Sequence, residues 1–179
     1  MSEVSELIDG VERARAELLA AASALTEVQA AWRPAEGQWS AIDVLEHLYL
    51  AELSGIAKIA AALDTFRSGH QWTDARPNQG KHIDAIVAAT WKPRETAPPI
   101  ATPHIGGPLC FWLSATRSLR PVLADLGATL AGVTLEDVVY PHFLCGPLDA
   151  RQRLEFLRFH IDRHVAQIAR IRDSAGFPG

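Results

Sequence analysis

Two histidines near the C-terminus, His160 and His164, are four residues apart in a segment with the apolar spacing of a helix. Residues four apart share one face of a helix, so both imidazoles can point at the same place. A third histidine, His47, lies in another segment of helical spacing, much earlier in the chain. If the two helices pack together, three neutral ring nitrogens converge. Three histidines with open positions beside them can hold a divalent metal that still binds water or substrate.

The residue types do not select the metal, because imidazole suits Zn, Ni, Fe and Cu alike. The alternative is structural: each histidine could be a core or boundary residue whose ring bonds to a backbone carbonyl. Burying three imidazoles without a cation would, however, require a partner for every ring nitrogen. We therefore interpret His47, His160 and His164 as the ligands of one metal ion.

Two other side chains are candidates for the surroundings of the metal. His142 precedes the expected helix of His160 by a short turn and could reach the open side of the site. We nevertheless expect His142 in a solvent-facing loop, because loops normally run over the surface. Asp43 lies one helical turn before His47 and could orient an imidazole. We favour a helix-capping role for Asp43, because it follows Ser40 by three residues.

The composition fits one domain with a hydrophobic core. The chain has 179 residues, of which 48% are hydrophobic, and it contains no internal repeat. With a net charge of −4 and dispersed basic residues, we expect no nucleic-acid partner. No apolar stretch is long enough to span a bilayer, and the N-terminus lacks the pattern of a signal peptide. We therefore expect a cytoplasmic protein without membrane contact, in which Cys110 and Cys145 are reduced.

Four segments have the apolar spacing of helices, and these must position the histidines. We expect helices at residues 3–31, 41–66, 108–128 and from 149 towards the C-terminus. Ser40 and Asp149 are the expected N-caps of the second and fourth helices, and Pro121 should kink or break the third. No segment has convincing strand periodicity. The expected fold class is therefore all-α, a four-helix bundle in which residues 1–179 form a single domain.

A long connection, residues 67–107, joins the second and third expected helices. Its five prolines exclude one long helix, although residues 81–90 can form a short one. Connections of this length in a compact domain often carry function. Two helices leave one side of the metal facing away from them, so we expect part of this connection to wall the metal pocket and set substrate choice. It carries Trp72, Trp91, His82 and His104. The alternative is a surface loop or a dimer contact.

Several segments taken together resemble the DinB/YfiT-like superfamily. In chain order they are Trp32-Arg33-Pro34-Ala35-Glu36-Gly37-Gln38-Trp39-Ser40, Glu46-His47-Leu48, Gly146-Pro147-Leu148, and then His160, His164, Gln167 and Ile168. The resemblance implies a four-helix bundle of unusual connectivity, with a long crossover between the second and third helices. It also implies a divalent metal such as Zn, Ni or Fe on His47, His160 and His164.

The same resemblance implies a class of reaction. Characterised relatives are thiol-dependent transferases or isomerases that use mycothiol, bacillithiol or glutathione, and dimers are frequent among them. By resemblance, the chain is a candidate metal-dependent enzyme that combines a low-molecular-weight thiol with a small-molecule electrophile, and a candidate homodimer. A non-catalytic metal-binding bundle and an interaction domain with structural histidines are the alternatives. The prolines and histidines of the long connection depart from the family pattern, and this region shapes the substrate side of the pocket. The resemblance therefore predicts the metal more firmly than the substrate.

Overall fold

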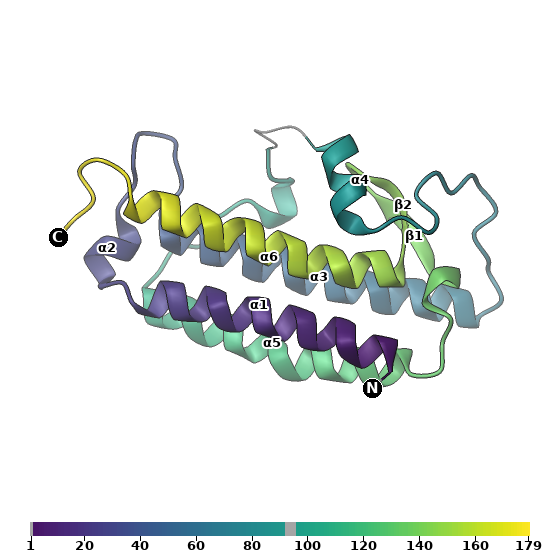
Figure 1. Cartoon of the computed structure of the whole chain (residues 1–179). Coiled ribbons are helices and arrows are strands. Elements are labelled where there is room, and N and C mark those ends of the chain that lie inside the picture. Colours follow the sequence, from purple (N-terminus) through teal and green to yellow (C-terminus); the bar gives the residue numbers. More distant parts are fainter. Residues whose placement is uncertain (1, 92–95) are drawn as a thin grey trace.

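The computed structural model describes residues 2–91 and 96–179, which form a bundle of long helices (Figure 1). The long helices are α1 (Glu3–Ser23), α3 (Ala41–Arg67), α5 (Leu109–Leu130) and α6 (Ala150–Arg172). The shorter elements are α2 (Glu27–Ala31), α4 (Ile83–Thr90), η1 (Pro99–Ala101), η2 (Leu135–Asp137), β1 (Val139–His142) and β2 (Gly146–Asp149). The expected four-helix bundle is confirmed, as is the long crossover between α3 and α5.

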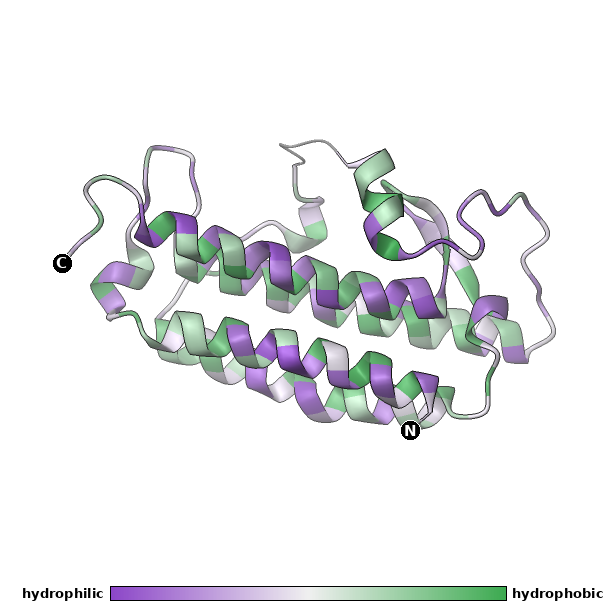
Figure 2. Cartoon of the chain, in the orientation of Figure 1, coloured by the Kyte–Doolittle hydropathy of each residue, from purple (hydrophilic) through white to green (hydrophobic). Residues whose placement is uncertain are grey.

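The four long helices pack as a closed ring, in which α1 lies between α5 and α6 and α3 completes the ring on the opposite side (Figure 1). Each helix buries an apolar stripe in the centre of this ring, and the green and purple residues that alternate along the helices show this amphipathic pattern (Figure 2). Val11, Leu45, Leu123 and Leu154, one from each helix, have no exposed surface. This core holds α3 and α6, the histidine-bearing helices, side by side.

Reciprocal caps fix the first turns of these two helices. The Ser40 hydroxyl accepts a hydrogen bond from the Asp43 N–H at 3.1 Å, and the Asp43 carboxylate accepts one from the Ser40 N–H at 2.7 Å. Asp149 and Gln152 form the same arrangement at the start of α6. Because each cap satisfies backbone N–H groups that have no partner within the helix, it determines where the helix begins. Both predicted N-caps are confirmed.

The N-terminal helix and α5 differ from expectation. The first helix ends at Ser23, and a capping box between Thr26 and Gln29 begins the separate α2, so the single helix expected at 3–31 is wrong. The helix α5 continues through Pro121, which excludes the break, one of the two effects that we expected of this proline. Proline removes one backbone hydrogen bond, and the buried Leu119 and Leu123 on either side of it keep both halves packed on the core.

The expectation that the chain lacks strands is also wrong. β1 and β2 pair antiparallel, with Tyr140 opposite Leu148 and Pro141 opposite Pro147. Each strand has four residues and contains a proline, so neither has the alternating apolar pattern from which strands are predicted. The hairpin lies directly before α6 and folds back beside it (Figure 1).

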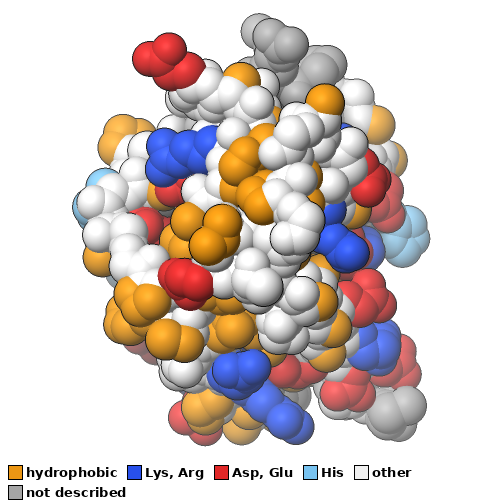
Figure 3. All heavy atoms as spheres, turned by 90° about the vertical axis from the view of Figure 1, so that its left-hand side faces the viewer, with side chains coloured by type: hydrophobic (Ala, Val, Ile, Leu, Met, Phe, Trp, Pro, Cys, Tyr) orange, Lys and Arg blue, Asp and Glu red, His pale blue; other side chains and the backbone are white. Residues whose placement is uncertain are grey.

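At the end of the bundle where the chain terminates, apolar side chains are interspersed with acidic and basic ones (Figure 3). Among the described residues, no helix combines the length and the apolar character that a membrane crossing requires. Both cysteines are free, with Cys110 exposed and Cys145 buried, which agrees with the expected reduced state.

Candidate metal centre

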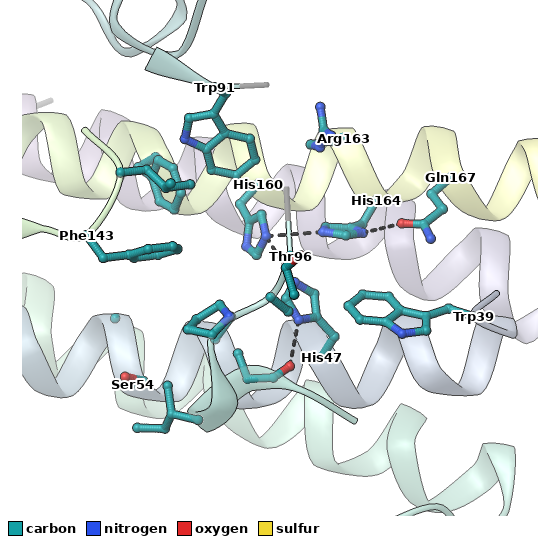
Figure 4. Close-up of a pocket in the computed structure, with 18 of the residues that line it drawn as sticks. Trp39, His47, Ser54, Trp91, Thr96, Phe143, His160, Arg163, His164 and Gln167 are labelled. Atoms are coloured by element: carbon teal, nitrogen blue, oxygen red, sulfur yellow. Dashed lines mark hydrogen bonds between the residues drawn. The ribbon is translucent and has the colours of Figure 1, made fainter. Parts of the chain in front are cut away.

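The packing of α3 against α6 brings the three predicted histidines together (Figure 4). Nε2 of His160 lies 3.2 Å from Nε2 of His47 and 3.1 Å from Nε2 of His164. The candidate ligand atoms of all three rings lie within 4.8 Å of one another. His47 and His164 are buried and His160 is partly buried. The spacing of four residues on α6 therefore has the geometric effect expected of it, and α3 supplies the third ring.

Two of the rings are fixed by hydrogen bonds at their other nitrogen. Nδ1 of His47 lies 2.7 Å from the backbone oxygen of Ala101, and Nδ1 of His164 lies 2.7 Å from Oε1 of Gln167. Because an oxygen acceptor at Nδ1 requires the proton there, Nε2 of each ring presents a lone pair. A histidine that donates from one nitrogen to a carbonyl while the other is free to coordinate is typical of metal ligands.

The donor set fits a divalent metal ion better than a hydrogen-bonded group of three rings. Neutral His160 has at most one proton on Nε2, so it can satisfy only one of the two lone pairs that face it. A metal bound to Nε2 atoms at about 2.0–2.1 Å holds neighbouring nitrogens about 2.9–3.4 Å apart. The two Nε2 separations of 3.1 and 3.2 Å lie within that range.

The surroundings keep the three rings neutral. Burial, followed by the neighbouring rings of His164 and His47, lowers the pKa of His160 well below its ordinary value. Burial and the neighbouring His47 lower the pKa of His164 to about 3. Burial also lowers the pKa of His47, against the opposing effect of its bond to the Ala101 carbonyl. Neutral imidazole is the form that binds a metal, so no proton has to be removed at neutral pH.

The crossover is fastened to α3 directly beside His47. The buried carboxylate of Glu46 accepts hydrogen bonds from three consecutive backbone N–H groups, those of His104, Ile105 and Gly106, at 2.5, 2.7 and 2.9 Å. Burial opposes the charge of Glu46, but these N–H groups outweigh it and the pKa of the carboxyl is lowered. Sequence reasoning gave Glu46 no role, and its position next to His47 is the signal that could have identified it.

A cavity of about 990 Å³ extends from the three histidines. Its aromatic lining residues are Trp39, Trp91, Phe143 and Phe156. From the crossover it is lined by Trp91, Thr96, Ala97, Pro98, Ile100 and Ala101, so the prediction that this connection walls the pocket is confirmed. Trp72, His82 and His104 are not among the described residues that line it. Residues 92–95 of the same connection lie outside the described part of the chain.

Asp43 does not take part in the cavity. Its carboxylate caps α3 through Ser40 and accepts a hydrogen bond from Nη2 of Arg33 at 2.9 Å. It is not among the described lining residues. The capping role that we favoured for Asp43 is confirmed.

The expectation for His142 is wrong, because this residue is buried and lines the cavity rather than facing solvent. The hairpin folds it back over α6, where its ring centroid lies 4.7 Å from that of Phe156. The N–H groups of Leu144 and Cys145 donate to its Nδ1 at 3.3 and 3.2 Å. In the neutral ring, the proton therefore lies on Nε2.

The protonation state of His142 is set by its surroundings. Burial and the positive charges of Arg153 and Lys58 lower its pKa to about 3. A neutral ring whose Nδ1 lone pair is occupied offers a hydrogen-bond donor at Nε2. His142 is therefore suited to bind an acceptor atom and poorly suited to act as a general base.

The charge around the cavity is of one sign. Its basic lining residues are Lys58, Arg153, Arg163 and Arg170, and the described lining residues include no aspartate or glutamate. Within the described chain, none of these four forms a salt bridge. Sequence reasoning missed this group because no pattern within α6 singles out its three arginines, and Lys58 comes from the distant helix α3.

Comparison with known proteins gives one match. The model of the family described as the DinB superfamily matches residues 11–168 of this chain. The matched span includes His47, His160 and His164, together with the crossover and the hairpin. Neither a curated protein nor a solved structure matches the chain.

Proposed function

The chain belongs to the DinB superfamily, and on that premise we propose that it holds one divalent metal ion on His47, His160 and His164. The observation that carries the proposal is the convergence of three Nε2 atoms, two of them on rings whose Nδ1 protons are already engaged. Without a cation, one buried lone pair in this group has no donor, which is costly in a low-dielectric environment. A metal ion satisfies all three nitrogens at once.

We propose further that the protein is a transferase or isomerase that combines a low-molecular-weight thiol with a small electrophile. A divalent ion on three neutral imidazoles lowers the pKa of a thiol or water that reaches it. A cavity of about 990 Å³ is of the size that takes an organic ligand. Its aromatic walls would hold the apolar part of such a ligand and exclude water from the three histidines.

The residues around the cavity have separate tasks in this proposal. The Ala101 carbonyl and the Gln167 side chain hold the rings of His47 and His164 in the orientation that presents Nε2. Trp39 packs against the His47 ring, with 4.8 Å between the ring centroids, and limits its rotation. His142 donates from Nε2 to an acceptor atom of the ligand.

The test is an activity assay on full-length protein purified without a histidine tag and loaded with Zn²⁺. Glutathione, bacillithiol and mycothiol are each combined with a panel of electrophilic acceptors. Loss of free thiol reports transfer, and conversion of the acceptor with the thiol regenerated reports isomerisation. We expect turnover that requires the metal and is lost in His160→Ala. His70→Ala, which removes an exposed histidine outside the cavity, is the matched control. Metal binding without turnover across the panel would favour a non-catalytic metal-binding module.

A further inference from the structure

Arg153 of α6 is a buried cation that lines the cavity without an anionic partner. It is 6% exposed, and no carboxylate in the described chain lies within salt-bridge distance of it. Its Nη2 donates to the backbone oxygens of Tyr140 and Pro141 at 3.1 and 2.6 Å, while its Nε has no partner. The guanidinium also lies 3.6 Å from the centroid of the Tyr140 ring. These contacts offset only part of the cost of burying a charge.

Two further groups, each from a different element, line the same cavity as Arg153. Lys58 of α3 is close enough that its charge acts, together with that of Arg153, on His142 of β1. All three residues line the same cavity. His142 contributes the N–H at Nε2, because the N–H groups of Leu144 and Cys145 occupy its Nδ1. Two cations and a neutral donor therefore line one cavity, with Arg153 and His142 at its hairpin end.

We propose that Arg153, His142 and Lys58 form a subsite that binds the carboxylate of an organic ligand. The proposal rests on the proposed function in one respect, namely that the reacting part of the same ligand lies at the three histidines. Phe156 connects the two places, because its ring centroid lies 4.7 Å from that of His142 and 5.6 Å from that of His160. The apolar body of the ligand lies along this ring.

The donors favour a carboxylate over a phosphate group. Nη2 of Arg153 is already engaged by two carbonyls, and His142 adds a single N–H. A phosphate usually takes several donors from a glycine-rich loop or a free helix N-terminus. The N-terminus of α6 is instead occupied by its own cap, Asp149.

The alternative is that Arg153 only fastens the hairpin to α6, and a pair of matched probes separates the two accounts. Full-length, metal-free protein is titrated with 3-phenylpropanoate and with 3-phenylpropanamide, which has the same shape without the charge, and binding is followed calorimetrically. We expect the carboxylate to bind at least about tenfold more tightly than the amide, as for a charge-assisted hydrogen bond. Equal affinities, or no saturable binding of the carboxylate at millimolar concentrations, would overturn the proposal.

Substitutions then assign the preference to residues. Lys58 is exposed, so Lys58→Met should fold normally, weaken the carboxylate about three- to tenfold and leave the amide unchanged. Arg153→Met should abolish the preference. If Arg153→Met does not fold, Lys58→Met decides alone. Lys81→Met, which removes an exposed lysine outside the cavity, is the control and should change nothing. A preference of the same size in Lys58→Met as in the wild-type protein would overturn the proposal.

The His160→Ala variant separates this subsite from the proposed metal. Because His160 is not one of the three residues of the subsite, the metal-free variant should keep the preference for the carboxylate. If the preference is present only in metal-loaded wild-type protein and absent from His160→Ala, the carboxylate binds the metal itself. That result would overturn the subsite and leave the proposed metal centre intact. A wild-type protein that binds no metal but keeps the preference would do the reverse, because it would overturn the proposed metal centre and leave the subsite intact.

Discussion

The backbone oxygen of Ala101 accepts a hydrogen bond from Nδ1 of His47 at a distance of 2.7 Å. The crossover therefore does more than cover the cavity, because it fixes the ring of a proposed metal ligand on α3. Glu46, the residue before His47, holds the next part of the same crossover through three backbone N–H groups. One turn of α3 thus carries both His47, the proposed metal ligand, and Glu46, which holds the crossover whose Ala101 carbonyl orients the His47 ring.

Glu46→Gln should weaken metal binding without removing a ligand. A neutral amide is a poorer acceptor than a carboxylate and cannot satisfy three N–H groups equally, so the Ala101 carbonyl should lose its fixed position. We expect a loss of about 1–3 kcal/mol in the free energy of unfolding and about a tenfold loss of Zn²⁺ affinity. Chemical denaturation and a competition titration with a chelator measure the two effects. Glu17→Gln, at an exposed position of α1, should change neither, and an unchanged Zn²⁺ affinity in Glu46→Gln would contradict this role.

Gln167→Leu should weaken metal binding through His164, the other buried histidine of the proposed centre. Removing the acceptor of the His164 Nδ1 proton frees the ring to rotate and to change tautomer, so we expect a roughly 10- to 100-fold loss of metal affinity. Gln167→Glu keeps an acceptor at the same place and should retain most of the affinity. Equal affinities for the leucine and glutamate variants would show that this hydrogen bond does not orient the ligand.

The stability of the metal-free protein should fall as the pH is lowered from 7 to 5. The pKa of His142 is about 3 in the folded chain and about 6.5 in an unfolded one. The unfolded state therefore binds the proton first, and the stabilisation is present in full above pH 6.5 and is lost progressively as the pH falls towards 3. At pH 5, protonation of this one histidine in the unfolded state lowers the free energy of unfolding by about 2 kcal/mol relative to neutral pH.

Urea denaturation at pH 7.5 and pH 5.0 measures this loss, and His142→Gln isolates the share of His142. Glutamine has no proton to bind, so the variant should lose about 2 kcal/mol less than the wild-type protein between the two pH values. The same pH dependence in both proteins would mean that His142 is not buried as a neutral ring.

His142 should be observable as the tautomer with its proton on Nε2. The two backbone N–H groups that donate to Nδ1 leave no room for a proton there. Long-range ¹H–¹⁵N spectra distinguish the two ring nitrogens, and the resonances of His142 are assigned by their loss in His142→Gln. We expect the Nε2–H form at pH 7 and no protonation at pH 6. A proton on Nδ1 would remove the donor that the carboxylate subsite requires.

Local chemistry made much of this site predictable from the sequence. The spacing of His160 and His164 specifies a shared helix face, and Ser40 and Asp149 begin helices because their side chains accept backbone N–H groups two or three residues ahead. The helical spacing of the segment around His47 made it a candidate third ring, and the resemblance to the superfamily pattern supported it. Each of these signals depends only on residues close together in the chain or on an ordered motif.

The remainder of the site depends on contacts between distant segments. Arg153 occupies a polar position next to the apolar stripe of α6, and it is buried in the fold, where the ring of Tyr140 packs against its guanidinium. His142 is carried inward by a hairpin whose short, proline-bearing strands have no recognisable pattern. No periodicity within the hairpin or within α6 specifies that the two will pack together. The placement of Arg153 and His142 at the hairpin end of the cavity was therefore not predicted.

The metal content of the purified protein tests the central claim most directly. Full-length wild-type protein, His160→Ala and His70→Ala are expressed without an affinity tag, purified in the same way and analysed for Zn, Ni and Fe by elemental mass spectrometry. The proposed centre predicts close to one ion per chain in the wild-type protein and in His70→Ala, and close to none in His160→Ala. Equal metal content in the wild-type protein and His160→Ala would contradict it.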